Sequence, residues 1–257
     1  MAPKTRFRDL IRTQREASPE LPLVHSTDAY RFVDIMDSDS LTPQSCRIFG
    51  QPLLYCFYGR PAYRANLDEA PSGLGHYLPV CVLFKAPKGC TPRRVFPFDS
   101  GAFKSGYYEE AIHRAMSVDD FGLDADPHTP GRVISLFFGS VGAYLNTQPS
   151  NALEVDFTQF EARAYHALIT KQTKSNADDR VCAIEVQLDE SVSLQSAAQA
   201  IIGPGPLLEC APVKNYISRL GIDALPYDQL GRARPGEYAT ELVRLCREYY
   251  KRSGLMS

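Results

Sequence analysis

The chain has 257 residues, of which 44% are hydrophobic and 23% are charged, and its formal net charge is -2. This length suits one large domain or two small ones, and the composition is typical of a folded globular protein, which excludes a largely disordered chain. A charge so close to zero excludes a whole-molecule attraction to nucleic acid or to an anionic membrane. A nucleic-acid partner would therefore need a local site.

The first residues and the cysteines indicate the compartment. Residues 1–15 are basic and polar and lack the apolar core of a secretory signal, and no run of about 18 apolar residues predicts a membrane span. Seven cysteines stand at 46, 56, 81, 90, 182, 210 and 246, with no Cys-x-x-Cys pair. We therefore expect a cytoplasmic protein with buried thiols, no disulfide framework, no metal and no membrane contact.

The elements are predicted in chain order from hydrophobic periodicity. Residues 1–20 form a polar N-terminal arm, either flexible or a short docking helix, and a single domain covers 21–257. A helix is predicted to start at Ser26-Thr27-Asp28, and the apolar runs Leu53–Tyr58 and Pro79–Phe84 predict buried strands. Further patterns predict strands over 94–98, 181–188, 198–202 and 222–226, a loop over 117–130, and helices over 107–116, 131–145, 157–169, 208–220 and 235–251. The mixture lacks a strict βαβ rhythm, which favours the α+β class.

The first candidate site segment is Leu23-Val24-His25-Ser26-Thr27. It predicts a short strand that ends in polar side chains just before a helix, where backbone amides and side-chain donors converge on ligands. The alternative is that Thr27 only caps the helix and that His25 bonds to a buried neighbour.

The second segment is Phe57-Tyr58-Gly59-Arg60-Pro61-Ala62-Tyr63-Arg64. An arginine between a glycine and a proline, directly after a buried strand, has little backbone freedom. Such an arginine is suited to bidentate contact with a pyrophosphate. The alternative is a surface turn in which Arg60 and Arg64 are solvated or paired with carboxylates.

The third segment runs from Arg180 to Leu188. Period-two alternation places Cys182, Ile184, Val186 and Leu188 on the core face of a strand. Glu185 and Gln187 share the opposite face with Ala183, an arrangement that suits the floor of a polar cleft. The alternative is the solvent face of a half-exposed sheet.

Taken in order, these motifs resemble the start and the catalytic strand of the DarT-type DNA ADP-ribosyltransferase toxins and their relatives. In that family a His-x-Thr strand is followed by a helix and by a strand ending in an aromatic pair and an Arg/Pro turn. A glutamate lies later, on a strand shortly after an arginine. The resemblance covers about residues 21–64 and 178–227, and the section from about 65 to 177 has no match.

The resemblance implies an α+β fold of ADP-ribosyltransferase-like mixed sheets, flanked by helices around an NAD cleft. His25 and Thr27 would hold the nicotinamide amide and its ribose, and Glu185 would be the catalytic carboxylate. Arg60 would contact the phosphates. The turn is shorter than the family pattern, so Arg64 is an alternative to Arg60. We expect Tyr58 and Gln187 to complete the NAD-binding set.

The implied activity is transfer of ADP-ribose from NAD to a macromolecule, in a toxin or phage-defence effector with a possible antitoxin or regulatory partner. Cleaving the nicotinamide–ribose bond develops an oxocarbenium-like cation that a fixed carboxylate stabilises, and no metal is needed. The loop 170–179 would read the acceptor, and its charges are compatible with DNA, RNA or protein. The alternatives are an NAD glycohydrolase and an inactive domain that binds a nucleotide or partner as a sensor.

Overall fold

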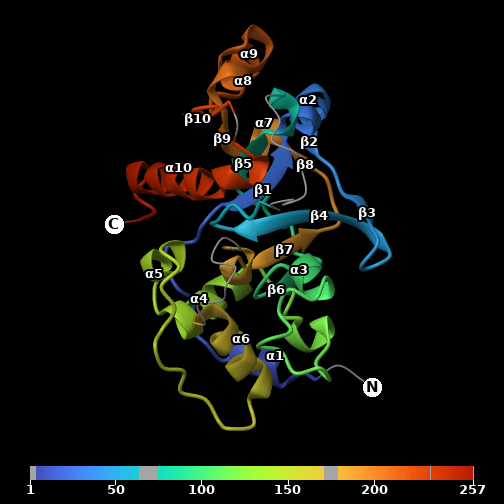
Figure 1. Ribbon diagram of the computed structural model, residues 1–257, viewed down its shortest axis with the longest axis vertical. Coiled ribbons are helices and arrows are strands. Elements are labelled where there is room, and N and C mark those ends of the chain that lie inside the picture. Colours follow the sequence, from blue (N-terminus) through green and yellow to red (C-terminus); the bar gives the residue numbers. More distant parts are fainter. Residues whose placement is uncertain (1–3, 64–73, 171–178, 232, 257) are drawn as a thin grey trace.

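A mixed sheet runs through the middle of the molecule in a computed structural model that describes residues 4–63, 74–170, 179–231 and 233–256 (Figure 1). The strand order is β10-β9-β5-β1-β4-β7-β6, β3 pairs with β4, and β2 and β8 form a separate pair. Only β9 and β10 pair in parallel among the described strands. The strands are β1 Leu23–Asp28, β2 Ser40–Leu41, β3 Gln44–Cys46, β4 Gln51–Tyr58, β5 Pro79–Phe84, β6 Arg94–Phe96, β7 Glu185–Leu188, β8 Val192–Ser193, β9 Ala198–Pro204 and β10 Asp223–Tyr227.

Most helices lie in two groups at opposite ends of the view, and α10 lies apart from both, beside β5 and β1, so the fold belongs to the predicted α+β class (Figure 1). In Figure 1, α1, α3, α4, α5 and α6 lie below β4 and β7, while α2, α7, α8 and α9 lie at the opposite end, beyond β1 and β5. The α-helices are α1 Arg6–Arg12, α2 Ala29–Ser38, α3 Ser100–Lys104, α4 Thr129–Phe138, α5 Val141–Leu145, α6 Phe160–Thr170, α7 Leu194–Ala197, α8 Gly205–Glu209, α9 Ala211–Leu220 and α10 Ala239–Arg252. The 3₁₀ helices are η1 Gly75–Tyr77, η2 Val118–Phe121, η3 Asp179–Cys182 and η4 Pro235–Tyr238.

The central strands β1 and β4 separate soon after they meet. β1 pairs with β5 along its whole length, from Leu23 to Asp28, but it pairs with β4 only at Leu23 and Val24. Figure 1 shows the result, because β1 runs up the view while β4 and β7 cross it. On the side of β4, the remaining four residues of β1 therefore face an opening instead of a paired strand.

The N-terminal arm docks as a short helix. In α1, Phe7 and Ile11 are buried, and the Phe7 ring packs against Phe137 and Tyr165. The guanidinium of Arg6 donates to both carboxylate oxygens of the buried Glu161, at 2.5 and 2.8 Å. These contacts integrate the arm into the lower group of helices.

Most predicted strands and helices are present, but one helix is wrong and one strand is shorter than predicted. The strand expected over 181–188 forms only as Glu185–Leu188, because the chain before it turns as the 3₁₀ helix Asp179–Cys182. Residues 107–116 form turns, and α3 lies earlier. The His113 ring nitrogen accepts the Ala115 amide, a local bond that competes with helical pairing. The predicted helix over 131–145 is two helices, because Gly139 adopts a left-handed φ of 74°.

The remaining sequence expectations concern thiols, metals and membranes. None of the seven cysteines forms a disulfide, and five are buried. Within the described ranges no three His, Cys, Asp or Glu side chains cluster as a metal site would require. A search of the same ranges finds no helix with the length and hydropathy of a membrane span.

Candidate functional site

The three segments singled out in the sequence fold into three neighbouring strands. β1 carries His25 and Thr27, β4 leads to Arg60, and β7 carries Glu185. The sheet order places β4 between the other two strands, although β7 follows β4 by more than a hundred residues. The chain thus brings the backbone of all three motifs together.

A pocket of about 490 Å³ opens where β1 and β4 separate. Its size falls within the range of about 300–1,000 Å³ that is usual for small-molecule sites. The positively charged side chain in its lining is Arg31 of α2, whose guanidinium lies 3.4 Å from the Asp28 carboxylate. The lining consists of His25, Ser26, Thr27, Arg31, Asp34, Ile35, Ser38, Ser40, Leu41, Thr42, Gln44, Leu53, Leu54 and Tyr55.

His25 is fixed across the opening by a hydrogen bond to the opposite strand. Its Nδ1 lies 2.9 Å from the carbonyl oxygen of Tyr55. Burial lowers the pKa of His25, and the bond to the Tyr55 carbonyl opposes that shift. The neutral ring then donates through Nδ1 and keeps Nε2 as an acceptor. The two interpretations of His25 drawn from the sequence are therefore both met in part, since His25 has a buried partner and also lines the pocket. The helix cap expected at Thr27 is wrong, because Asp28 caps α2 by accepting the Arg31 amide and Thr27 belongs to β1.

Tyr55 connects this pocket to β7. It lines the pocket, and in the sheet it stands opposite Gln187. Its hydroxyl lies 2.8 Å from the Cys46 thiol. Burial raises the pKa of Tyr55 first, followed by the bond to Cys46 and then by the charge of Glu185. Tyr55 was not singled out from the sequence, although its place within the aromatic run of β4 is a signal that could have found it.

Glu185 lies fully buried beneath α3, so the solvent-facing alternative is wrong. The Ser100 hydroxyl donates to Oε1 at 2.7 Å and the Ser100 amide donates to Oε2 at 2.9 Å. Gln187 donates to Oε1 at 2.5 Å and is also fully buried. The predicted face is therefore polar, as expected, but it is covered. Ser100 was missed because it lies outside the motif segments.

The surroundings of Glu185 favour its neutral form. Its pKa is raised to about 8, first by burial and second by the charge of Asp99, while the hydrogen bonds from Ser100 and Gln187 act in the opposite direction. Asp99 caps α3 by accepting the Ala102 amide and lies 3.6 Å from the Arg180 guanidinium. Such a shift at a buried carboxyl is typical of functional sites and also occurs in structural networks.

Arg60 occupies a different environment from the one expected of a phosphate ligand. Gly59 forms the turn before it with a φ of 66°, and a Cβ at this position would lie 2.3 Å from Leu21. The Arg60 side chain is 1% exposed, and its Nη1 donates to the Tyr144 carbonyl at 2.8 Å. The guanidinium also lies 5.6 Å from the centre of the Tyr144 ring. Arg60 thus packs against α5 and does not line the pocket between β1 and β4.

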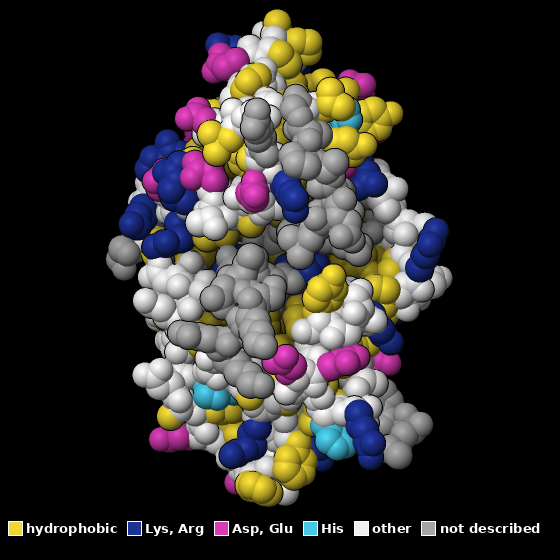
Figure 2. Space-filling model, viewed as in Figure 1, with side chains coloured by type: hydrophobic (Ala, Val, Ile, Leu, Met, Phe, Trp, Pro, Cys, Tyr) yellow, Lys and Arg dark blue, Asp and Glu magenta, His cyan; other side chains and the backbone are white. Residues whose placement is uncertain are grey.

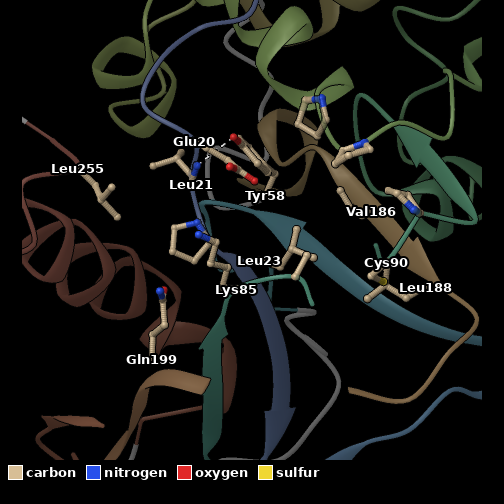
Figure 3. Close-up of a pocket in the computed structure, with 15 residues that line it drawn as sticks. Glu20, Leu21, Leu23, Tyr58, Lys85, Cys90, Val186, Leu188, Gln199 and Leu255 are labelled. Carbon is tan, nitrogen blue, oxygen red and sulfur yellow. Dashed lines mark hydrogen bonds between the residues drawn. The ribbon is translucent and has the colours of Figure 1, made fainter. Parts of the chain in front are cut away.

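Tyr58 points to the other face of the sheet. Figure 3 shows it beside Leu23 and Val186, around a second, smaller pocket of about 140 Å³. Its hydroxyl accepts the Leu21 amide at 2.9 Å. Because Tyr58 and Glu185 extend from opposite faces, the structure does not bring these two predicted site residues together.

Two expectations lie outside the described residues. Arg64, the alternative phosphate ligand, falls in the undescribed range 64–73. The predicted acceptor loop falls almost entirely in 171–178. Both remain predictions from the sequence.

Charges of both signs are mixed on the face seen in Figure 2. Basic side chains at its left, beside α10, are accompanied by acidic ones. Arg244 of α10 forms ion pairs with Glu241 and Glu248. This region therefore carries paired charges and does not form a uniformly basic surface for nucleic acid.

Comparisons with known proteins identify no relative. No family model matches the chain, and no curated protein and no solved structure matches it either.

Proposed function

We propose that the chain is an NAD-dependent ADP-ribosyltransferase that transfers ADP-ribose to a macromolecular acceptor. One observation carries the proposal: the three motif strands β1, β4 and β7 are neighbours, and β1 and β4 separate into a pocket beside the strand of Glu185. The ordered resemblance to the DarT-type enzymes predicts a cleft at these same strands.

The pocket between β1 and β4 would hold the nicotinamide ribose of NAD. Neutral His25 offers Nε2 as an acceptor for a ribose hydroxyl, because its Nδ1 is occupied by the Tyr55 carbonyl. Thr27 lines the same pocket with a hydroxyl that can donate or accept. Tyr55 would contact the nucleotide at the end of the pocket nearest Gln187. Substrate held by fixed groups loses less freedom at the reacting step.

Glu185 would act at the anomeric carbon. The nicotinamide–ribose bond breaks with its electron pair going to the nicotinamide nitrogen, which leaves as a neutral base. The ionised Glu185 stabilises the positive charge that develops on the ribose and then accepts the proton of the attacking acceptor. This role requires a carboxylate, so ionisation of Glu185 precedes turnover.

Arg60 would support this arrangement indirectly. Its guanidinium holds α5 through the Tyr144 carbonyl, and the Tyr144 hydroxyl in turn donates to the Tyr58 carbonyl at 2.6 Å, at the end of β4. Arg60 is therefore proposed as a positioning residue. Phosphate contact by Arg64 stays a prediction from the resemblance.

A second candidate function is a nucleotide-binding sensor without turnover. The complete burial of Glu185 and its raised pKa favour this reading, because a neutral, covered carboxyl cannot stabilise a cation. An NAD glycohydrolase, with water as the acceptor, would use the same site as the transferase.

The test is incubation of the purified chain with NAD labelled in its adenylate half, with and without cell lysate. Nicotinamide release that requires lysate and is accompanied by transfer of the label to macromolecules supports the transferase. Nicotinamide release in buffer alone supports the glycohydrolase. Binding without release supports the sensor. Glu185→Gln is expected to lower turnover by at least about 100-fold, whereas Glu190→Gln, an exposed carboxylate after the same strand, is the matched control. Full turnover in Glu185→Gln would overturn the proposed mechanism.

A further inference from the structure

A row of side chains extends the candidate site beyond Glu185 onto β6. Arg94 of β6 stands opposite Gln187 of β7, and Gln187 stands opposite Tyr55 of β4. Neighbouring strands lie about 4.8 Å apart, so Arg94 begins about 10 Å from the pocket-lining Tyr55. In the adjacent row, Phe96 stands opposite Glu185. Arg94 therefore lies on the same face as the carboxyl, one strand further from the pocket.

The guanidinium of Arg94 is held by aromatic packing. Its central carbon lies 4.5 Å from the centre of the Phe49 ring, and Phe49 stacks on Phe96 with ring centres 5.7 Å apart. Phe49 lies in the turn between β3 and β4. An arginine over an aromatic face keeps its N–H donors in the plane of the guanidinium, where they point away from the ring and stay available for a bidentate acceptor.

Among the described residues, Arg94 lies beside an aromatic ring and not beside a carboxylate. Within the described part of the chain, no carboxylate forms an ion pair with Arg94, and its buried Nη1 has no hydrogen-bond partner. Its neighbour Arg93, by contrast, lies 3.7 Å from the Asp189 carboxylate. A half-buried guanidinium without an acceptor is costly unless a ligand supplies one.

From this geometry we infer that Arg94 and Phe49 form a subsite for a phosphate group of a bound substrate, on the β6 side of Glu185. Phosphate matches the forked donors of arginine, and a charge-assisted bond to the accessible part of the guanidinium would supply the missing counter-charge. The phosphate comes either from the diphosphate of the dinucleotide or from the acceptor. This inference rests on the proposed function for the identity of those substrates.

The test measures binding of inorganic pyrophosphate by calorimetry to the wild type, Arg94→Met and Arg93→Met. Methionine keeps an unbranched apolar chain against Phe49 but removes the charge, and Arg93→Met removes a neighbouring charge of the same sign. We expect at least tenfold weaker binding in Arg94→Met and unchanged binding in Arg93→Met. Equal binding in the wild type and Arg94→Met, an equal loss in both variants, or no binding to the wild type overturns the inference.

A kinetic arm identifies the source of the phosphate. A tenfold higher KM for NAD in Arg94→Met assigns the subsite to the dinucleotide. An unchanged KM together with lost pyrophosphate binding assigns it to the acceptor. If the wild type releases no nicotinamide, the proposed function fails, and the pyrophosphate measurement still decides the role of Arg94. Thermal unfolding of each variant shows whether a loss of binding reflects a loss of fold.

Discussion

Ser100 binds both oxygens of the Glu185 carboxyl, one through its hydroxyl and the other through its backbone amide. The two residues are 85 positions apart, and both are fully buried. Because Ser100 begins α3, the carboxyl is oriented by a helix end and not by its own strand alone. This bond pair, with Asp99 beside it, determines how readily Glu185 ionises.

The first prediction concerns the pH dependence of turnover. Glu185 has a pKa of about 8 in the free protein, and the proposed mechanism requires its ionised form. The value of kcat/KM for nicotinamide release should therefore rise about tenfold per pH unit below that pKa and level off above it. Initial rates between pH 6 and 9.5 check this. A rate that is flat between pH 6 and 8 would contradict the assignment.

The second prediction separates the two neighbours of Glu185. Asp99→Asn removes a like charge while asparagine can still cap α3, so the midpoint of the pH profile should move to lower pH. Ser100→Ala removes the hydroxyl donor to the charged form, so the midpoint should move to higher pH. The same pH–rate measurement serves both variants. Shifts in the same direction, or none, would show that these groups do not control Glu185.

The third prediction is a pH-dependent stability. The pKa of Glu185 is raised in the folded state above its unfolded value of about 4.3. The stabilisation from the neutral carboxyl is complete below the unfolded pKa and is lost as pH rises through about 8. From pH 5 to pH 9, the free energy of unfolding of the wild type should fall by on the order of 4 kcal/mol relative to that of Glu185→Gln. Denaturant unfolding at the two pH values measures this difference.

The glutamine variant is suited to this comparison. Gln187 has a buried Oε1 with no hydrogen-bond partner in the described structure, and rotating its amide would let that oxygen accept from the new amide at position 185. The exposed Glu190→Gln should follow the wild type. Parallel pH curves for the wild type and Glu185→Gln would rule out a buried, titrating carboxyl.

The fourth prediction concerns the β1 side of the pocket. Thr27→Val keeps the shape and strand preference of the residue but removes its hydroxyl, and we expect about a tenfold weaker affinity for NAD, the equivalent of one hydrogen bond. Isothermal titration with NAD and with free nicotinamide measures it. The comparison is Thr42→Val, which removes a hydroxyl from the same pocket at a position that follows β2. Equal affinity in wild type and Thr27→Val would remove Thr27 from the site.

The fifth prediction separates fold from binding at Arg60. Because its side chain is buried against Tyr144, Arg60→Met should lower the free energy of unfolding by about 1–3 kcal/mol. At a temperature where the variant remains folded, its KM for NAD should change by less than threefold. A large rise in KM without loss of stability would instead return Arg60 to the phosphate-binding role expected from the resemblance.

Local patterns predicted the parts of the fold that are governed by local chemistry. The uninterrupted apolar runs of β4 and β5 lie where expected, and the alternation around Glu185 correctly separates its two faces. The failures involve contacts across the chain. Nothing in the sequence near Glu185 indicates that Ser100 would cover it. The sequence Gly59-Arg60-Pro61 is equally compatible with a surface turn and with a buried guanidinium, so it could not tell these two environments apart.

The Arg94–Phe49 contact could not be predicted for a similar reason. Phe49 and Arg94 lie on separate segments, and only the register of β6 on β7 and the turn between β3 and β4 bring them together. Such long-range pairs leave no signal in a single sequence. The hydrophobic period identifies which face of a strand a side chain occupies, whereas the residues that it contacts on that face depend on how the strands are arranged in the sheet.

The early separation of β1 from β4 has a mechanical consequence. β1 is anchored along its full length to β5, and β4 is anchored to β7 at four positions, but only two pairs join the two halves of the sheet. Beyond those two pairs, the bond between His25 Nδ1 and the Tyr55 carbonyl also joins β1 to β4, so a ligand that widens the opening would have to break it. A ligand bound at His25 would therefore act on β4 as well as on β1, and β4 pairs directly with the strand of Glu185.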